Sequence, residues 1–167
     1  MGQMNTAHEG ITLLGLGPGD PGLLTRQAWD LISNLPEIYL RTRQHPIVSH
    51  FPPDLKIHSF DYLYENGDSF EQIYSRIVSI VLEMSKLSGE VVYAVPGHPF
   101  VAEATSPEIS RRAKVEGIPV RVIEGLSFID AIFAALEVDP LPQTVILDGL
   151  EIAMAHFPPY PPSAPAI

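Results

Sequence analysis

The chain has 167 residues, of which 46% are hydrophobic and 18% are charged, a composition that predicts a globular domain with a buried core and excludes global disorder. Twenty acidic and ten basic side chains give a net charge of -10, so no basic stripe is available for nucleic acid, and the lack of cysteine excludes disulfides and thiolate metal sites. A polar start and the absence of an apolar run of ~20 residues favour a cytoplasmic protein with no membrane segment.

Short apolar runs of the β type alternate along the chain with amphipathic helical stretches. This alternation is typical of a parallel sheet that is covered by helices on both faces. We therefore predict an α/β fold with a mostly parallel sheet of five or six strands. The predicted strands are Ile11–Leu16, Glu37–Leu40, Lys56–Phe60, Glu90–Val95, Pro119–Ile123 and Thr144–Leu147.

The first predicted strand runs into a loop that holds four glycines between residues 15 and 22. Glycines allow positive φ and let a ligand approach the main chain. The spacing differs from the dinucleotide fingerprint, Pro18 removes a backbone donor and Asp20 adds a carboxylate, so the loop disfavours a phosphate and favours a neutral or cationic ligand such as a sulfonium. The alternative is a tight turn in which Asp20 caps the following helix.

The second predicted strand ends in Arg41 and Arg43. Guanidinium forks suit bidentate recognition of carboxylates, so both side chains are candidates for binding a substrate, although arginines at a strand end are more often only solvated. His45 and the other histidines show no metal-ligand spacing, so no metal site is predicted.

Three helices are marked by their ends. The longest is predicted to begin with a cap at Asp68 and to stop at Gly89. Another begins at Ser106-Pro107, a cap followed by the residue favoured at the first helical position, and stops at Gly117. A third follows Ser127, whose position fits helix capping as well as ligand contact.

The fourth predicted strand ends in Val95-Pro-Gly-His-Pro-Phe100, a loop made rigid by its prolines. Gly97 lets this loop come close to a ligand, and a simple sharp turn is the alternative. We expect His98 to position a ligand rather than to act as a base, because no partner that would orient its ring is identifiable. Since the carboxyl ends of parallel strands lie at one edge, the ends of the first, second, fourth and fifth strands should form one rim.

Five of the last ten residues are prolines, at positions 158, 159, 161, 162 and 165. Such a segment extends neither a sheet nor a helix and is typical of a linker. We therefore divide the chain into a disordered or tag-like start (residues 1–10), one domain (residues 11–150) and a linker towards a second domain (residues 151–167).

Taken together, the loops resemble those of the tetrapyrrole (corrin/porphyrin) methylases. Gly15-Leu-Gly-Pro-Gly-Asp-Pro-Gly-Leu-Leu-Thr25 matches this family in spacing and flanking residues. Val95-Pro-Gly-His-Pro99 stands where the family usually carries Gly-Asp-Pro, and Gly125-Leu-Ser-Phe-Ile-Asp-Ala131 stands at its Gly-x-Ser/Thr turn.

Four further stretches resemble the YabN-type subgroup, in which a methylase-like module is fused ahead of a MazG-type nucleotide pyrophosphohydrolase. This chain has no E-x-x-E acidic helix motif, so the pyrophosphohydrolase activity is not assigned to it. The four stretches are Tyr39–Pro46, Ser59–Glu65, Tyr93–Glu103 and Phe133–Pro140.

The resemblance implies the first domain of an S-adenosylmethionine-dependent methyltransferase. The activated donor needs orientation more than a nucleophile, so no catalytic residue is assigned. The methyl acceptor would be a small molecule such as a tetrapyrrole, and an exposed domain-facing surface would favour a homodimer. Motif correspondence assigns Gly15, Gly17, Pro18, Gly97, His98, Val101, Ser127 and Phe128 to the cofactor, and we assign Asp20, Arg41 and Arg43 to the substrate.

Two departures from the family bear on activity. His98 replaces the family's Asp, and the chain stops at about the hinge before the second domain. We therefore expect these 167 residues to bind S-adenosylmethionine weakly or not at all. The alternative function is a non-catalytic sensing or docking module that regulates a fused pyrophosphohydrolase. An NADP-dependent enzyme that uses Arg41 is disfavoured by the first loop.

Overall fold

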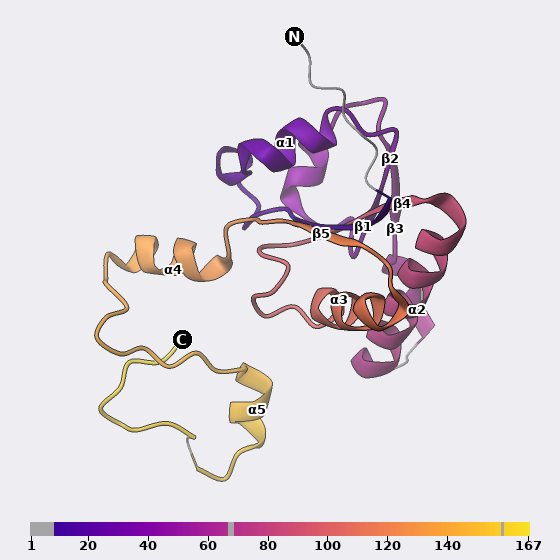
Figure 1. Ribbon diagram of the computed structural model, residues 1–167. Coiled ribbons are helices and arrows are strands. Elements are labelled where there is room, and N and C mark those ends of the chain that lie inside the picture. Colours follow the sequence, from indigo (N-terminus) through magenta and orange to yellow (C-terminus); the bar gives the residue numbers. More distant parts are fainter. Residues whose placement is uncertain (1–8, 67–68, 158) are drawn as a thin grey trace. The chain divides into compact units, whose positions relative to one another are not determined.

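The computed structural model describes residues 9–66, 69–157 and 159–167 (Figure 1). The chain divides into two compact units, Met1–Phe128 and Ile129–Ile167. The start predicted to be disordered or tag-like falls mostly on residues 1–8, outside the described residues.

The first unit is built on a parallel sheet of five strands in the order β3-β2-β4-β1-β5. The predicted α/β fold is confirmed, and each of the five strands lies within one residue of its predicted ends. The strands are β1 (Gly10–Gly15), β2 (Glu37–Leu40), β3 (Lys56–Ser59), β4 (Glu90–Val95) and β5 (Val120–Ile123).

The predicted strand at residues 144–147 is wrong, because this segment does not join the sheet. In the second unit it makes a single parallel bridge, between Val145 and Ala166. The short pairing is limited by Pro165, whose carbonyl accepts a bond from Val145 but which has no N–H to return. A β-type composition alone does not supply a pairing partner.

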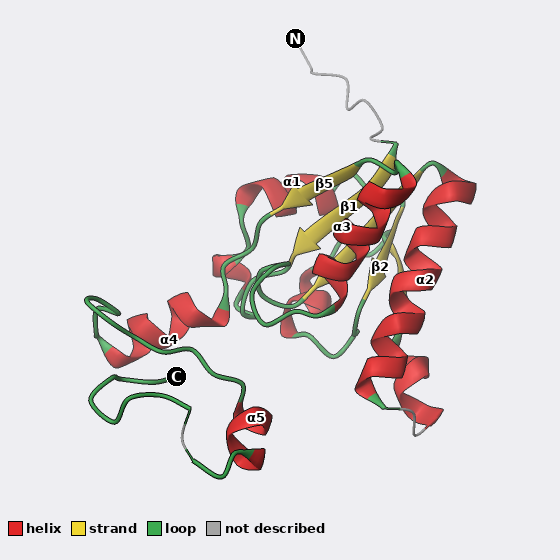
Figure 2. Ribbon diagram, turned by 60° about the horizontal axis from the view of Figure 1, so that its bottom comes forward, coloured by secondary structure: helices red, strands yellow, loops and turns green. Residues whose placement is uncertain are grey.

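Helices cover both faces of the sheet, and Figure 2 shows α2 and α3 side by side on one of them. Ile11 and Leu13 of β1 pack towards α2 and α3, while Leu14 and Leu16 pack towards α1 on the other face. All four side chains are fully buried, which explains why β1 appears in the sequence as an apolar run that only Thr12 interrupts. The α-helices are α1 (Arg26–Ile32), α2 (Phe70–Ser88), α3 (Thr105–Glu116), α4 (Phe128–Leu136) and α5 (Gly149–Met154), and the 3-10 helices are η1 (Pro21–Leu23), η2 (Pro46–His50) and η3 (Asp61–Asn66).

Helix α2 begins with a capping box. The Ser69 hydroxyl accepts a bond from the Gln72 N–H, and the Gln72 side chain accepts one from the Ser69 N–H. The predicted cap, Asp68, lies outside the described residues. The predicted stop at Gly89 is confirmed, with φ of 80°.

We expect Ser69→Ala to lower the free energy of unfolding by about 1 kcal/mol, since one donor in the first turn of α2 loses its partner. Urea denaturation measures this difference. Ser75→Ala, an exposed position within the same helix, is the control and should cost nothing, because alanine has the higher helix propensity. Equal losses in both variants would contradict the prediction.

Helix α3 begins at Thr105, two residues before Pro107, the predicted first helical position. Ser106 is therefore not the cap: it lies buried in the first turn, and its hydroxyl has no hydrogen-bond partner. The carboxylate of Glu103 instead accepts a bond from the Thr105 N–H. The predicted stop at Gly117 is confirmed, with φ of 70°.

Among the helices of the described ranges, none combines the length and apolar character that crossing a bilayer requires.

Candidate functional site

The loops that follow four neighbouring strands meet at one edge of the sheet. β2, β4, β1 and β5 are adjacent and parallel, so the predicted rim of four strand ends is confirmed. The chain leaves β1 towards β2 on one side and leaves β4 towards β5 on the other. The order of strands therefore reverses between β1 and β4, which is where open α/β sheets bind ligands.

At this reversal, the loops after β1 and β4 are joined through two glycines. The Gly17 N–H donates to the Gly97 carbonyl at 3.1 Å, and the Gly97 N–H donates to the Gly17 carbonyl at 2.8 Å. Both residues have positive φ, 69° and 68°, a conformation that is strained for other residues. The joined loops are thus held in a conformation that requires glycine at both positions.

Gly15 and Gly125 bring the loop after β5 against the other two. A Cβ on Gly15 would lie 2.5 Å from the Gly125 nitrogen and 2.7 Å from the Gly97 oxygen. A Cβ on Gly125 would lie 2.8 Å from the Gly15 carbonyl carbon. Glycine is therefore needed at these positions so that three loops can pack, whereas the sequence suggested that Gly15 leaves room for a ligand.

Gly97 differs from these glycines because, apart from its two chain neighbours, no atom of the residues that the structure describes lies within 4 Å of the position that its Cβ would occupy. A ligand can therefore approach the main chain of the loop after β4 at this point. Among the predicted cofactor residues, Pro18 and Val101 are half-buried, Ser127 is buried, and Phe128 is 40% exposed at the start of α4.

His98 is fixed by its own loop. Its Nδ1 atom accepts a bond from the Phe100 N–H at 3.0 Å, and its carbonyl accepts one from the Val101 N–H. An aspartate carboxylate can accept the same bond from the residue two positions ahead. The Nδ1 atom of His98 can therefore close this turn as an aspartate oxygen would.

Asp20 caps the short helix η1, where its carboxylate accepts a bond from the Gly22 N–H at 2.7 Å. Helix α1 has its own cap, Thr25, whose hydroxyl also donates to the Glu124 carbonyl at the end of β5. Asp20 thus has the capping role that was the alternative in the sequence, although the turn that it caps is η1. Its assignment to substrate binding stays a prediction.

Arg41, at the end of β2, forms an ion pair with Glu103 from the loop after β4. The Glu103 side chain is only 2% exposed, and that of Arg41 is 21% exposed. A buried carboxylate needs such a cation, because transferring the charged group out of water without a partner would cost several kcal/mol.

Glu103 also ends a chain of hydrogen bonds from the core. Its carboxylate accepts bonds from the N–H and the hydroxyl of Thr105, so the Thr105 oxygen is left to accept the bond from the Tyr93 hydroxyl at 2.9 Å. Burial raises the pKa of Tyr93, which keeps this phenol protonated as a donor. Every donor in this series of hydrogen bonds points towards Glu103.

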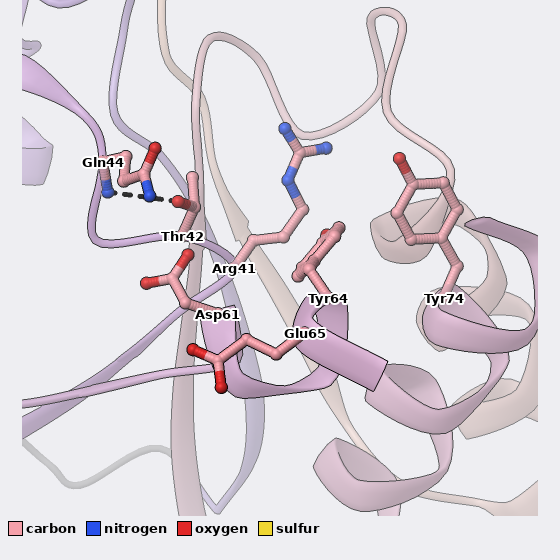
Figure 3. A pocket seen from close by; sticks show the side chains of 7 residues that line it. All are labelled: Arg41, Thr42, Gln44, Asp61, Tyr64, Glu65 and Tyr74. Atoms are coloured by element: carbon pink, nitrogen blue, oxygen red, sulfur yellow. Dashed lines mark hydrogen bonds between the residues drawn. The ribbon is translucent and has the colours of Figure 1, made fainter. Parts of the chain in front are cut away.

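Arg41 reaches into a pocket of about 440 Å³ between the end of β2, η3 and α2. Figure 3 shows Arg41 between Thr42 and Tyr64, with Tyr74 approaching from α2. Burial raises the pKa of Tyr64, against the effect of the Arg41 cation. The lining residues are Arg41, Thr42, Gln44, Asp61, Tyr64, Glu65 and Tyr74.

Asp61 and Arg43 interact at the side of this pocket. Burial opposes the ionisation of Asp61, but hydrogen bonds from Thr42, from the Arg43 N–H and from Ser59 outweigh it and lower the pKa of Asp61. The Arg43 guanidinium donates to the Ile57 carbonyl at 2.5 Å and does not line the pocket. The structure thus separates two arginines that the sequence treated as a pair.

His45 was considered in the sequence only as a metal ligand, yet it supports the first loop. Its ring hydrogen-bonds with the backbone of Gly17, and its Nδ1 atom is buried without a hydrogen-bond partner. Burial lowers the pKa of His45, the bond to Gly17 opposes this, and Arg41 lowers it further. The ring of His45 is therefore a neutral imidazole that contacts the loop after β1.

Glu103, Tyr64 and Tyr74 are among the site residues that sequence reasoning missed. Glu103 and Tyr64 lie in two of the stretches that resemble the YabN-type subgroup, which was the one available signal. Tyr74 lies within the longest predicted helix, where nothing in the sequence singled it out.

Comparisons with known proteins agree with this fold. A model of the family "Tetrapyrrole (Corrin/Porphyrin) Methylases" matches residues 10–150. The chain is 42% identical over 132 residues to the uncharacterized protein YabN of Bacillus subtilis (strain 168). The aligned region covers 78% of this chain and 27% of YabN. It therefore spans about a quarter of that relative.

Two solved structures share the fold. Cobalt precorrin-4 methyltransferase has a TM-score of 0.57 and 22% identity, over 81% of this chain and 56% of that one. Uroporphyrin-III C-methyltransferase from Thermus thermophilus, complexed with S-adenosyl homocysteine, has a TM-score of 0.56 and 23% identity, over 81% of this chain and 57% of that one.

Proposed function

The chain belongs to the tetrapyrrole (corrin/porphyrin) methylases, and from this membership we propose that it is an S-adenosylmethionine-binding domain of a methyltransferase. The single observation that carries the proposal is the open main chain at Gly97, at the point where the loops after β1 and β4 are joined. A structural neighbour that was solved with S-adenosyl homocysteine also supports this choice of cofactor.

The residues at this edge fit such a cofactor. Gly97 leaves space for a ligand beside the main chain, and Asp20 and the net charge of -10 favour a cationic sulfonium over a phosphate. When bound, S-adenosylmethionine supplies a methyl group that is already activated for transfer. We assign its binding to Gly15, Gly17, Pro18, Gly97, His98, Val101, Ser127 and Phe128.

This chain's own part is to hold and orient the reactants, which can supply much of the rate without a nucleophile. The glycine contacts fix three loops relative to one another, and Glu103 fixes Arg41 beside them. We place a small-molecule methyl acceptor in the Arg41 pocket, while Asp20 and Arg43 stay predictions as further substrate contacts.

Calorimetric titration of S-adenosyl homocysteine tests the proposal, performed on the full natural protein that carries this chain. We expect stoichiometric binding, and no binding of NADP at the same concentrations. Binding of NADP without S-adenosyl homocysteine would overturn the proposal.

The domain organisation is also a proposal. We infer that residues 11–150 form the methylase domain, that residues 151–167 form a linker, and that a MazG-type pyrophosphohydrolase follows. The similarity to YabN, which is much longer than the matched region, supports this organisation. The natural reading frame after residue 167 tests it, and a frame that encodes no such module would reject the fusion.

A further inference from the structure

The pocket that Arg41 lines, called the Arg41 pocket, offers a ligand little uncompensated positive charge. Arg41 is the only basic side chain among its lining residues, and the buried carboxylate of Glu103 neutralises it from behind. Asp61 is held ionised by its hydrogen bonds, and Glu65 is exposed at the pocket. With Glu103 included, the pocket therefore has three carboxylates for the one guanidinium among its lining residues.

Arg43 lies beside Asp61 without lining the pocket, and its positive charge helps to keep Asp61 ionised. Its guanidinium donates to the Ile57 carbonyl, and its backbone N–H donates to Asp61, so Arg43 stabilises the side of the pocket that Asp61 forms. Uncharged hydrogen-bonding groups make up the rest of the lining: the two phenols of Tyr64 and Tyr74, the Thr42 hydroxyl and the Gln44 amide.

We propose that the Arg41 pocket takes a ligand without carboxylates, uncharged or cationic, and that Glu103 sets this preference by neutralising Arg41. A polycarboxylate would bring further negative charges next to Asp61 and Glu65, where each meets like charge at short range. A neutral ligand instead meets the phenols, the amide and the remaining guanidinium N–H groups as hydrogen-bonding partners. The methyl acceptor is therefore not a polycarboxylate macrocycle; calling this ligand the acceptor rests on the proposed function.

The test compares one macrocycle in two charge states. Uroporphyrin III, a fluorescent polycarboxylate, and its uncharged methyl ester are titrated into the full natural protein at a fixed fraction of organic cosolvent. The unsubstituted protein should bind the ester more tightly than the acid. Tighter binding of the acid would overturn the proposal.

Three variants locate the effect. Glu103→Gln frees the Arg41 charge and should tighten binding of the acid about tenfold. Glu65→Gln, on an exposed side chain, should tighten it several-fold and carries the test if Glu103→Gln does not fold. Glu116→Gln is the control, because it removes one negative charge and frees a paired cation, Lys86, on the sides of α2 and α3. It should leave binding of the acid unchanged.

Weaker binding of the acid in both Glu103→Gln and Glu65→Gln would overturn the proposal, since those carboxylates would then help to hold a polycarboxylate. Equal tightening in Glu116→Gln would also overturn it, since net charge alone would explain the gain. S-adenosyl homocysteine is titrated separately into each sample. Its failure to bind would count against the proposed function, whereas the two macrocycles still report on the pocket.

Discussion

Gly15→Ala should lower the free energy of unfolding by about 3 kcal/mol or more. The new methyl group would lie 2.5 Å from the Gly125 nitrogen and 2.7 Å from the Gly97 oxygen. Both are backbone atoms, so no side chain can rotate away, and the loops after β4 and β5 would have to shift. Gly15 does not have positive φ, so the loss would measure steric overlap rather than backbone strain. Urea denaturation, followed by far-UV circular dichroism, measures it.

The matched control is Gly22→Ala in the same loop. Gly22 also lacks positive φ, and its Cβ would approach only the end of the Asp20 side chain, at 3.2 Å. This substitution should change the free energy of unfolding by no more than about 0.5 kcal/mol. Equal stability of the two variants would show that the three loops do not pack as described.

The strands of the first unit were predictable because a strand that is buried on both faces has apolar side chains at consecutive positions. β1 is apolar except for Thr12 and is completely buried, so its ends could be placed from the sequence within one residue. Residues 144–147 have a similar β-type composition, but their single bridge is to Ala166. Pairing depends on a partner elsewhere in the chain, and composition does not encode that partner.

The candidate site was predictable in its loops but not in its contacts. The sequence located Gly15, but the backbone that forces glycine there belongs to Gly97 and Gly125, far along the chain. It also singled out Arg41 as an anchor for carboxylates, whereas Glu103, 62 residues away, neutralises that charge. Both corrections concern contacts between strand ends, which become neighbours only once the order of the sheet is known.

Gly97→Ala should weaken binding of S-adenosyl homocysteine by about tenfold or more in the full natural protein. The methyl group would enter space beside the main chain assigned to the cofactor, where no described atom other than those of its chain neighbours lies within 4 Å. The substitution also carries a cost of backbone strain, because Gly97 has φ of 68° and alanine loses about 1 kcal/mol in this region. Calorimetric titration measures the loss of affinity, and denaturation measures the strain.

Gly117→Ala separates these two effects. Gly117 has φ of 70°, and within the described part of the chain only its sequence neighbours come within 4 Å of its Cβ position, so alanine meets the same strain and the same open space. It ends α3 ahead of β5, at the edge of the sheet opposite the joined loops. Both variants should therefore lose similar stability, whereas only Gly97→Ala should lose affinity. Unchanged affinity in Gly97→Ala would move the cofactor away from the loop after β4, and equal losses of affinity would trace the effect to stability instead of contact.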